Sequence, residues 1–424
     1  MKTFSLPYGN ASLTFTLPES CQVEEILPHP YTMPVNVDQT LQAALKDPLG
    51  STAFSHFPKD ASVGIAINDK TRPIPKPNPL RHLLQTLEKE GFAREKITLF
   101  ISSGTHTAMP EVEYSRLLAE DIVANYKIVV HDCDRSPMVD LGKTAYQTPI
   151  LINQAYFESD LKIAVGNIEP HHFMGFSGGV KTVAIGLAGR ETINTNHAML
   201  IRDHTLSGVY HINPMRQDVE EIGRKAGVHL VLGTVLNEEK EIMRVFFGDP
   251  ISVMLAAVPV VREVFGRTVP QPYDLVIASP GGAPKDINLY QSQKGLTHAA
   301  RITKDDGWVV LLAACPEGSG SQSYEDYITN VDSHKSVLNE FKSGFFKVGP
   351  HKAFQIAREA IRVRIILVSE IAPQNVKQWK ITPSQPEKLQ DLLDWLFIQL
   401  PPNPRIAILP GATRTMAEVQ NTND

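Results

Sequence analysis

Short apolar, β-branched runs alternate with helical patterns along most of the chain. Four such runs lie in the first half, and each ends in a loop marked by glycine, proline or polar residues; they span residues 62–69, 96–106, 161–172 and 229–237. Helical periodicity appears between them and after them, most clearly at 80–90 and 250–266. This alternation is typical of an α/β fold with a mostly parallel sheet.

A break in the pattern divides the chain. The stretch 266–274, GRTVPQPYD, carries two prolines and a glycine, as linkers do. Strand patterns then recur at 274–282, 307–320, 363–370 and 405–414, with amphipathic helices between them. We therefore expect two α/β domains with a mostly parallel sheet in each, one over 1–268 and one over 273–404, and either could take up a last strand within 405–424.

Unusual polar residues follow the carboxyl ends of the predicted strands. Asp69 and Arg72 come after the first run, His106 and His171 close two others, and in the second domain the polar stretch is 285–294. Ligands of open α/β sheets bind outside the carboxyl ends of the strands. The sequence therefore predicts one active site, in a cleft between the two domains.

Composition narrows the class of partner. The 424 residues are 42% hydrophobic with a formal net charge of −5, so there is no basic field for nucleic acid or an anionic membrane surface. The cysteines, Cys21, Cys133 and Cys315, lack CxxC spacing, which argues against a disulfide framework and indicates a reducing compartment. The longest apolar run, 251–261, is shorter than the about 20 residues of a membrane span. We expect a cytoplasmic protein that binds a small molecule.

One segment, 169–197, places three histidines and a lysine around a glycine-rich turn: EPHHFMGFSGGVKTVAIGLAGRETINTNH. A phosphate-binding P-loop has glycine directly before its lysine, whereas Val180 stands there, so a nucleotide triphosphatase is disfavoured. The apolar neighbours of Lys181 would desolvate its amine and favour the neutral, nucleophilic form, which makes covalent attachment a reasonable hypothesis. A solvated, inert loop lysine is the alternative.

Three histidines and two cations add candidate chemistry. Imidazole exchanges protons near neutral pH, so His106 and His171 are candidate acid/base groups, and His197, on an expected helix, is a candidate metal ligand. The absence of HExxH spacing disfavours a protease-like zinc site. Arg72 and Lys294 would together clamp a carboxylate, which indicates a small organic acid as substrate.

The motifs NDKTRPIP, SSGTH, GNIEPHHFMGFSGGVKT, TINTNH and NLYQSQKG occur in this order over nearly the whole chain. In order and spacing they resemble the nickel-dependent lactate racemases. The resemblance implies a nickel-pincer nucleotide as cofactor, that is, pyridinium-3-thioamide-5-thiocarboxylic acid mononucleotide with Ni. It also implies partner proteins that synthesise this cofactor.

Carried over residue by residue, the resemblance implies a role for each candidate. Lys181 would hold the cofactor through a thioamide bond, and His197 would ligate nickel. His106 and His171 would act as acid and base. The substrate carboxylate would be bound by Arg72 and Lys294, the pocket would be lined by Tyr290 and Gln291, and the nucleotide would be seated by Asp69, Thr71, Gly178 and Gly179.

The activity implied is racemisation or epimerisation at C2 of a small 2-hydroxy acid, by proton-coupled hydride transfer to the bound cofactor. Three positions depart from the family pattern: His172 replaces an aromatic residue, Val180 an arginine and His351 a tryptophan. These departures leave lactate, malate and aldonate-like acids open as substrates, since extra imidazoles suit polar substituents. The alternatives are a non-catalytic carrier or sensor of the cofactor and, with weaker support, a metal-assisted hydrolase.

Overall fold

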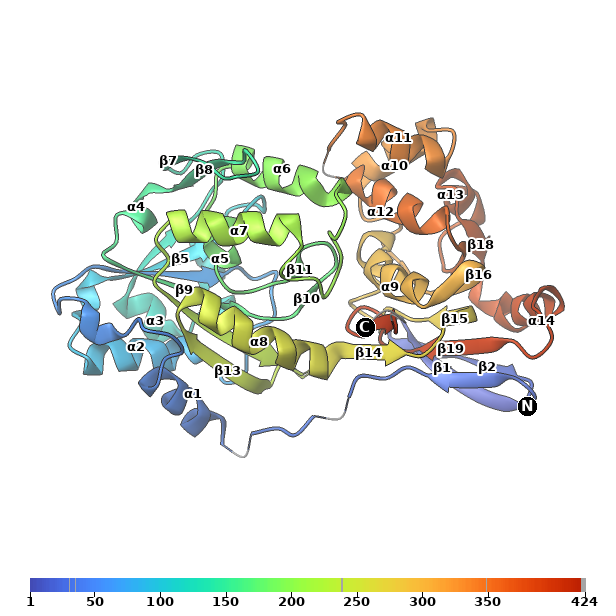
Figure 1. Ribbon diagram of the computed structural model, residues 1–424, viewed down its shortest axis with the longest axis horizontal. Coiled ribbons are helices and arrows are strands. Elements are labelled where there is room, and N and C mark those ends of the chain that lie inside the picture. The colour runs from blue at the N-terminus through green and yellow to red at the C-terminus, as the bar shows by residue number, and fades with distance from the viewer. Residues whose placement is uncertain (30, 35, 238, 348, 421–424) are drawn as a thin grey trace. The chain divides into compact units, whose positions relative to one another are not determined.

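Two six-stranded sheets organise the chain, as the α/β pattern predicted. The computed structural model describes residues 1–29, 31–34, 36–237, 239–347 and 349–420 (Figure 1). The chain divides into two units, which we call the N-terminal unit, Pro30–Glu263, and the C-terminal unit, which combines Met1–His29 with Val264–Asp424. No helix within the described residues is long and apolar enough to cross a bilayer.

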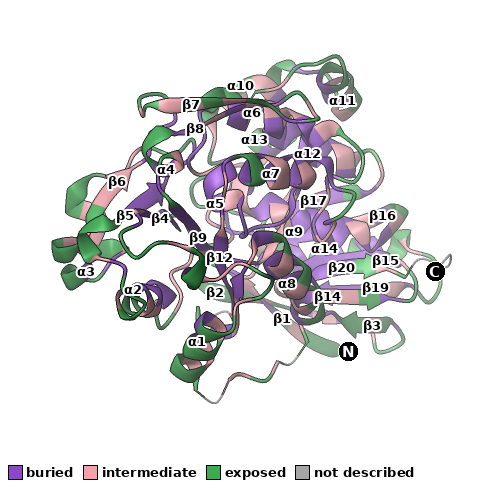
Figure 2. Ribbon diagram, turned by 60° about the vertical axis from the view of Figure 1, so that its left-hand side comes forward, coloured by how far each residue is buried: buried purple, intermediate pink, exposed green. Residues whose placement is uncertain are grey.

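The sheet of the N-terminal unit contains the four strands predicted in this part of the chain. Its strands, in spatial order, are β13 (Ile242–Gly248), β12 (Leu230–Leu236), β9 (Leu161–Asn167), β4 (Val63–Asn68), β5 (Ile97–Ser102) and β6 (Lys127–Val130). Neighbours from β12 to β6 are parallel, and only β13 pairs antiparallel, with β12. The central strands are buried on both faces (Figure 2), which explains why they appear as continuous apolar runs.

Helices cover both faces of this sheet. Ile65 and Leu99 share a core with Leu83 and Leu87 of α2 on one face. On the other face Phe100 meets the ring of Tyr156 edge-on. The helices of this unit are α1 (Val37–Lys46), α2 (Pro79–Lys89), α3 (Glu120–Asn125), α4 (Gln154–Phe157), α5 (Lys181–Ala184), α6 (Arg190–Ala198), α7 (Pro214–Lys225) and α8 (Pro250–Phe265).

Asparagine–proline pairs start two of these helices. The side chain of Asn78 accepts a hydrogen bond from the Leu80 amide at the start of α2, and Asn213 caps α7 through the Arg216 amide. Proline follows each cap, where its missing N–H costs nothing. The proline-rich stretch 71–78 is thus a loop that leads into α2.

The C-terminal unit has an all-parallel sheet. Its strands, in spatial order, are β18 (Thr382–Ser384), β17 (Arg364–Val368), β16 (Thr303–Leu312), β15 (Tyr273–Ala278), β19 (Arg405–Leu409) and β3 (Gln22–Glu25). Its helices are α9 (Leu289–Arg301), α10 (Gln322–Asn330), α11 (His334–Lys342), α12 (His351–Ala360), α13 (Pro373–Gln378) and α14 (Leu389–Gln399). Cys21 and Cys315 of this unit and Cys133 of the other are buried free thiols.

The expected domain boundaries, 1–268 and 273–404, are wrong at the start of the chain. Residues 1–29 belong to the C-terminal unit, because β3 pairs with β19. The hairpin of β1 (Lys2–Tyr8) and β2 (Ala11–Leu17) also places Leu6, Phe15 and Leu17 in the core of this unit, against Leu393 of α14. The sequence did not predict this pairing because β3 and β19 lie near opposite ends of the chain.

The predicted linker at 266–274 also differs from the structure. Residues Gly266–Val269 form β14, which pairs in parallel with β20 (Met416–Val419). The last strands stay with the C-terminal unit, since β19 lies between β15 and β3. The final residues, 421–424, lie outside the described part of the chain.

Three further two-stranded elements complete the description. They are β7 (Met138–Lys143) with β8 (Pro149–Asn153), β10 (Pro170–His171) with β11 (Gly175–Phe176), and the β14–β20 pair. The predicted strand 161–172 therefore ends at Asn167, and His171 lies on the separate short strand β10. His171 and His172 therefore lie on a separate hairpin that follows β9 and not on the sheet strand itself.

Candidate functional site

A pocket of about 40 Å³ opens at the carboxyl ends of β4, β9 and β12. Asp69, Arg72, Asn167 and Thr234 are among its lining residues. Asn167 holds the loop after β4 in place: its Nδ2 donates to the carbonyl of Pro73 at 2.7 Å, and its Oδ1 accepts from Thr234 Oγ1 at 2.8 Å. The predicted position of a ligand at strand ends thus coincides with a pocket.

Asp69, Thr71 and His106 form one hydrogen-bonded cluster beside this pocket. Asp69 Oδ2 lies 2.8 Å from His106 Nδ1, and its Oδ1 accepts from Thr71 Oγ1 at 2.6 Å. Burial alone would raise the pKa of Asp69, but the hydrogen bonds from His106 and Thr71 outweigh it and lower the pKa below its usual value. The carboxylate therefore stays ionised and fixes the orientation of the exposed imidazole.

His171 belongs to a second cluster, made of aromatic rings. Its ring stacks on His172 at 4.8 Å between centroids, and Phe173 meets both rings edge-on at 4.5 and 4.2 Å. Phe173 also meets the ring of His197 at 5.5 Å. Its phenyl ring therefore connects the histidine pair of the β10–β11 hairpin with the candidate metal ligand on α6.

The surroundings of His197 favour a neutral imidazole that carries its proton on Nδ1. Its Nδ1 lies 2.9 Å from the carbonyl oxygen of Ile193, one turn earlier on α6, and so donates to it. Burial, and to a smaller extent the positive charge of Lys181, lower the pKa of His197 to about 4. The lone pair on Nε2 is then available, as metal binding requires. This effect indicates that Lys181 lies within electrostatic range of His197.

The turn before Lys181 needs its glycines. Gly178 and Gly179 have φ angles of +72° and +61°, which side chains rarely adopt. A Cβ on Gly178 would lie 2.6 Å from the carbonyl oxygen of Asn167, and one on Gly179 would lie 2.8 Å from Arg216 Nη2. Lys181 itself is partly buried and starts the four-residue helix α5. The two-residue strand β11, rather than a sheet strand, precedes the turn, which agrees with the rejection of a P-loop.

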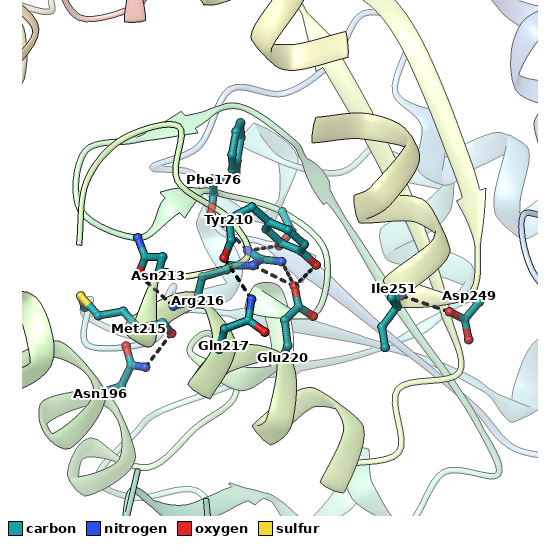
Figure 3. Close-up of polar contacts among 11 residues, drawn as sticks. Phe176, Asn196, Tyr210, Asn213, Met215, Arg216, Gln217, Glu220, Asp249 and Ile251 are labelled. Carbon is teal, nitrogen blue, oxygen red and sulfur yellow. Dashed lines mark hydrogen bonds and ion pairs between the residues drawn. The ribbon is translucent and has the colours of Figure 1, made fainter. Parts of the chain in front are cut away.

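Helix α7 approaches this turn with a buried arginine (Figure 3). Arg216 donates from Nη1 to the carbonyls of Phe176 and Gly178, each at 3.1 Å, and pairs with Glu220 at 2.6 Å. Two residues further on, the carboxylate of Asp218 accepts from Nδ2 of Asn196, the residue before His197. Sequence interpretation missed both charges, although helical spacing places Asp218 on the same face as the buried Met215 and Ile222.

In the C-terminal unit, the predicted residues lie in the first two turns of α9 and at the start of α12. Lys294 donates to Gln291 Oε1 at 2.6 Å, and the hydroxyl of Tyr290 lies 3.5 Å from His351 Nε2. The structure adds a residue that sequence interpretation missed, Lys352, whose Nζ lies 4.4 Å from the centre of the Tyr290 ring. Burial, and then the charge of Lys294, lower the pKa of Lys352 well below its usual value.

Within each unit, therefore, the predicted residues form small contact groups. Asp69, Thr71 and His106 lie together, and Lys181 lies near His197, while Arg72 lines the pocket and donates weakly to Thr71 at 3.5 Å. The predicted cleft between domains stays a prediction, as do the assigned roles. Asn167 could have been found in the sequence as a polar residue at a strand end, whereas nothing in the sequence distinguishes Lys352 from a surface lysine.

Comparisons with known proteins cover both units. The family model described as the lactate racemase N-terminal domain matches residues 8–208, and that of the lactate racemase C-terminal domain matches 269–410. A lactate racemase from Thermoanaerobacterium thermosaccharolyticum is 29% identical over 396 residues, 91% of this chain and 92% of the relative. One from Lactiplantibacillus plantarum is 28% identical over 381 residues, 88% and 89% of the two chains.

Solved structures agree with these matches. The lactate racemase apoprotein from Thermoanaerobacterium thermosaccharolyticum superposes with a TM-score of 0.89 at 28% identity, covering 99% of this chain and 100% of that one. A protein from Thermotoga maritima superposes with a TM-score of 0.63 at 17% identity, covering 92% and 100% of the two chains, which shows the fold alone.

Proposed function

The chain belongs to the lactate racemase family and is an isomerase of the racemase class, and from this premise we propose that it inverts C2 of a small 2-hydroxy acid, with lactate as the first substrate to test. The observation that carries the proposal is that the Nδ1 atoms of His106 and His171 face opposite kinds of partner, the Asp69 carboxylate and the Met174 amide. Inversion needs one group that takes a proton and another that gives one, and each enantiomer presents its hydroxyl from a different side.

The hydrogen-bond partners of His106 and His171 indicate which ring nitrogen of each imidazole carries a proton. His106 Nδ1 faces the Asp69 carboxylate at 2.8 Å, so Nδ1 carries the proton and Nε2 accepts one. His171 Nδ1 accepts from the Met174 amide at 3.2 Å, so the proton of its neutral ring lies on Nε2, which donates. His106 Nε2 is therefore placed to take the hydroxyl proton, while the Nε2–H of neutral His171 donates a hydrogen bond to the substrate oxygen. To return a proton as the acid, His171 must first gain a second proton on Nδ1, which then no longer accepts from the Met174 amide.

The residues around Lys181 fit the cofactor that the family resemblance implies. His197 offers a neutral Nε2 to nickel, Lys181 offers an amine beside it, and the cradle at Gly178 and Gly179 leaves no room for a Cβ. In this proposal Lys181 attaches the nickel-pincer nucleotide, His197 ligates its nickel, and Asp69 and Thr71 help to seat it. When bound, this cofactor supplies the acceptor and donor of hydride.

Charge and pocket polarity guide the choice of substrate. We assign Arg72 and Lys294 to the substrate carboxylate, and Tyr290 and Gln291 to the pocket wall. Gln291 orients the ammonium of Lys294 through their 2.6 Å hydrogen bond. Malate and aldonate-like acids follow lactate in the order of testing, because hydroxyl or carboxylate substituents need polar partners.

The test uses protein co-expressed with the cofactor-synthesis proteins. We expect the wild type to carry an added mass with about one nickel per chain and to interconvert D- and L-lactate, or another 2-hydroxy acid, in a chiral chromatography assay. Lys181→Arg should lose adduct, nickel and activity. The same change at Lys162, which donates to backbone carbonyls of Phe157 and Ser159, should keep the adduct.

Histidine variants separate an enzyme from a carrier. His106→Gln and His171→Gln should retain adduct and nickel and lose at least about 100-fold in turnover, the range that general acid–base groups contribute. His56→Gln, an exposed control, should behave as wild type. Adduct without turnover on any 2-hydroxy acid would overturn the racemase proposal in favour of a carrier, and absence of adduct and nickel would overturn the cofactor assignment.

A further inference from the structure

Helix α7 carries two charged side chains that are both fully buried, Arg216 and Asp218, each with 0% of its surface exposed. A buried charge is tolerated only where hydrogen bonds or an opposite charge compensate it. Replacement of such groups by apolar residues often leaves stability unchanged or raises it. A contribution to stability therefore does not by itself explain these two buried charges, and each of them holds particular groups in position.

Arg216 holds the chain just before Lys181. Its Nη1 bridges the carbonyls of Phe176 and Gly178, and its Nε and Nη2 donate to Glu220 Oε1 at 2.8 and 2.6 Å (Figure 3). Tyr210 also donates to the same Glu220 oxygen, at 2.9 Å. The planar guanidinium, fixed on one side by this acceptor, sets the spacing of the two carbonyls on the other.

A second contact brings the same helix against the residue adjacent to Lys181. A Cβ on Gly223 of α7 would lie 2.3 Å from the Cβ of Val180, so glycine there lets the buried Val180 pack directly on the helix. The turn is thus held both by directional hydrogen bonds and by close packing.

Asp218 holds the segment that carries His197. Its carboxylate accepts from Thr148 Oγ1 at 2.9 Å, from Thr144 Oγ1 and from Asn196 Nδ2 at 2.8 Å. The same amide group of Asn196 donates to the carbonyl of Met215 at 3.1 Å. Helix α6 is therefore fixed to α7 at the residue directly before His197.

We propose that Arg216 and Asp218 are positioning residues, and that α7 sets Lys181 and His197 in register so that one ligand is attached by the lysine and coordinated by the imidazole. The inference rests on the proposed function for the identity of that ligand. Each charge acts on one attachment point: Arg216 on the lysine, Asp218 on the histidine. The two variants should therefore have separable defects.

The first arm of the test uses apoprotein without cofactor. N-succinimidyl acetate labels lysines, and peptide mass spectrometry compares the rate at Lys181 with that at the exposed Lys127 of the same molecule. Arg216→Lys, which keeps the charge but loses the fork of donors, should raise the relative rate at Lys181 at least fivefold. Asp218→Asn should leave it within twofold, as should Arg224→Lys, an exposed arginine of the same helix.

The second arm uses protein loaded in cells. Arg216→Lys should lower the adduct at Lys181 at least tenfold, whereas Asp218→Asn should keep the adduct and lose nickel to a chelator at least fivefold faster than wild type. Melting curves accompany both arms. If Arg216→Lys fails to fold, Glu220→Gln replaces it, because this change loosens the arginine without removing its donors.

The outcomes are distinct. Wild-type rates of labelling, loading and nickel loss in folded variants would overturn the positioning roles and leave Arg216 and Asp218 as structural groups. Equal defects of both variants in both readouts would overturn the division of roles. A wild type that takes up no adduct, together with the expected labelling change in Arg216→Lys, would refute the cofactor assignment and support the role of Arg216 toward Lys181.

Discussion

Replacement of Asp69 by asparagine should reverse the tautomer of His106. Asp69 Oδ1 accepts from both the hydroxyl and the amide of Thr71, at 2.6 and 3.2 Å, and Oδ2 faces His106 Nδ1. An asparagine has one oxygen, and the two Thr71 donors hold it on their side. The NH₂ group then faces Nδ1, which must accept, so the proton of His106 moves to Nε2 and the proposed base atom is lost.

The expected loss follows from this tautomer change. Replacing the carboxylate behind a catalytic histidine with an amide lowers turnover by about 10⁴-fold where the histidine is enclosed. The side chain of His106 is 46% exposed, so water competes for its nitrogens and the ring can rotate to recover some activity. We therefore expect kcat to fall about 10²- to 10³-fold, which is about 3–4 kcal/mol in activation free energy. Because Asp69 also helps to seat the cofactor in this proposal, turnover is expressed per nickel-loaded chain.

Two measurements check this prediction. Turnover of both enantiomers is compared for Asp69→Asn, wild type and the surface control Asp60→Asn, at equal nickel content. Long-range ¹H–¹⁵N spectra of the apoprotein report which nitrogen of His106 carries the proton. A variant that keeps the proton on Nδ1, or that shows the new tautomer with unchanged turnover, would refute the reasoning.

Two further predictions concern stability. Gly175→Ala should destabilise the protein by about 3 kcal/mol or more, because the new Cβ would lie 1.8 Å from the carbonyl oxygen of Val209. Gly142 has a similar positive φ but nothing within 4 Å of the position of a Cβ, so Gly142→Ala should cost about 1 kcal/mol. Chemical denaturation measures the free energy of unfolding of both variants. Burial lowers the pKa of His298 to about 4, so the unfolded chain binds more protons between pH 6.5 and 4 and stability falls as pH falls through that window, by about 2 kcal/mol from pH 7 to 5. His298→Asn keeps a donor for the carbonyl of Ala412 and should remove this part of the pH dependence in melting curves, so an unchanged dependence would contradict the assignment.

The central strands were predictable because burial on both faces leaves a local record. Strands β4, β9 and β12 are buried along nearly all of their length, and valine, isoleucine and leucine make up most of them. The edge strands are different: β3 has four mostly exposed residues and gains its identity only by pairing with β19, which lies near the other end of the chain. No local pattern encodes such a partner, which is why the first 29 residues were assigned to the wrong unit.

The candidate site was predictable as a set of residues but not as an arrangement. Spacing and family resemblance named Lys181, His106 and His171. The proton positions on the two imidazoles depend on hydrogen-bond partners that residue types do not reveal. One such partner is the backbone amide of Met174, which faces His171 Nδ1. Backbone donors leave no mark on residue type, so only the fold could show that the two imidazoles have different hydrogen-bond partners.

The three departures from the family pattern now separate into two kinds. Val180 is buried against Gly223, so this change concerns packing behind Lys181. His172 and His351 are different, because each ring contacts a residue with a proposed role in the reaction: His172 stacks on His171, and His351 meets the ring of Tyr290 at 5.8 Å between centroids. Imidazoles at these positions add hydrogen-bonding groups where an indole or phenyl ring would add apolar surface. Substrate choice should therefore change with His172 and His351, and a Val180→Arg variant should alter stability or loading while leaving the order of preferred substrates as it is.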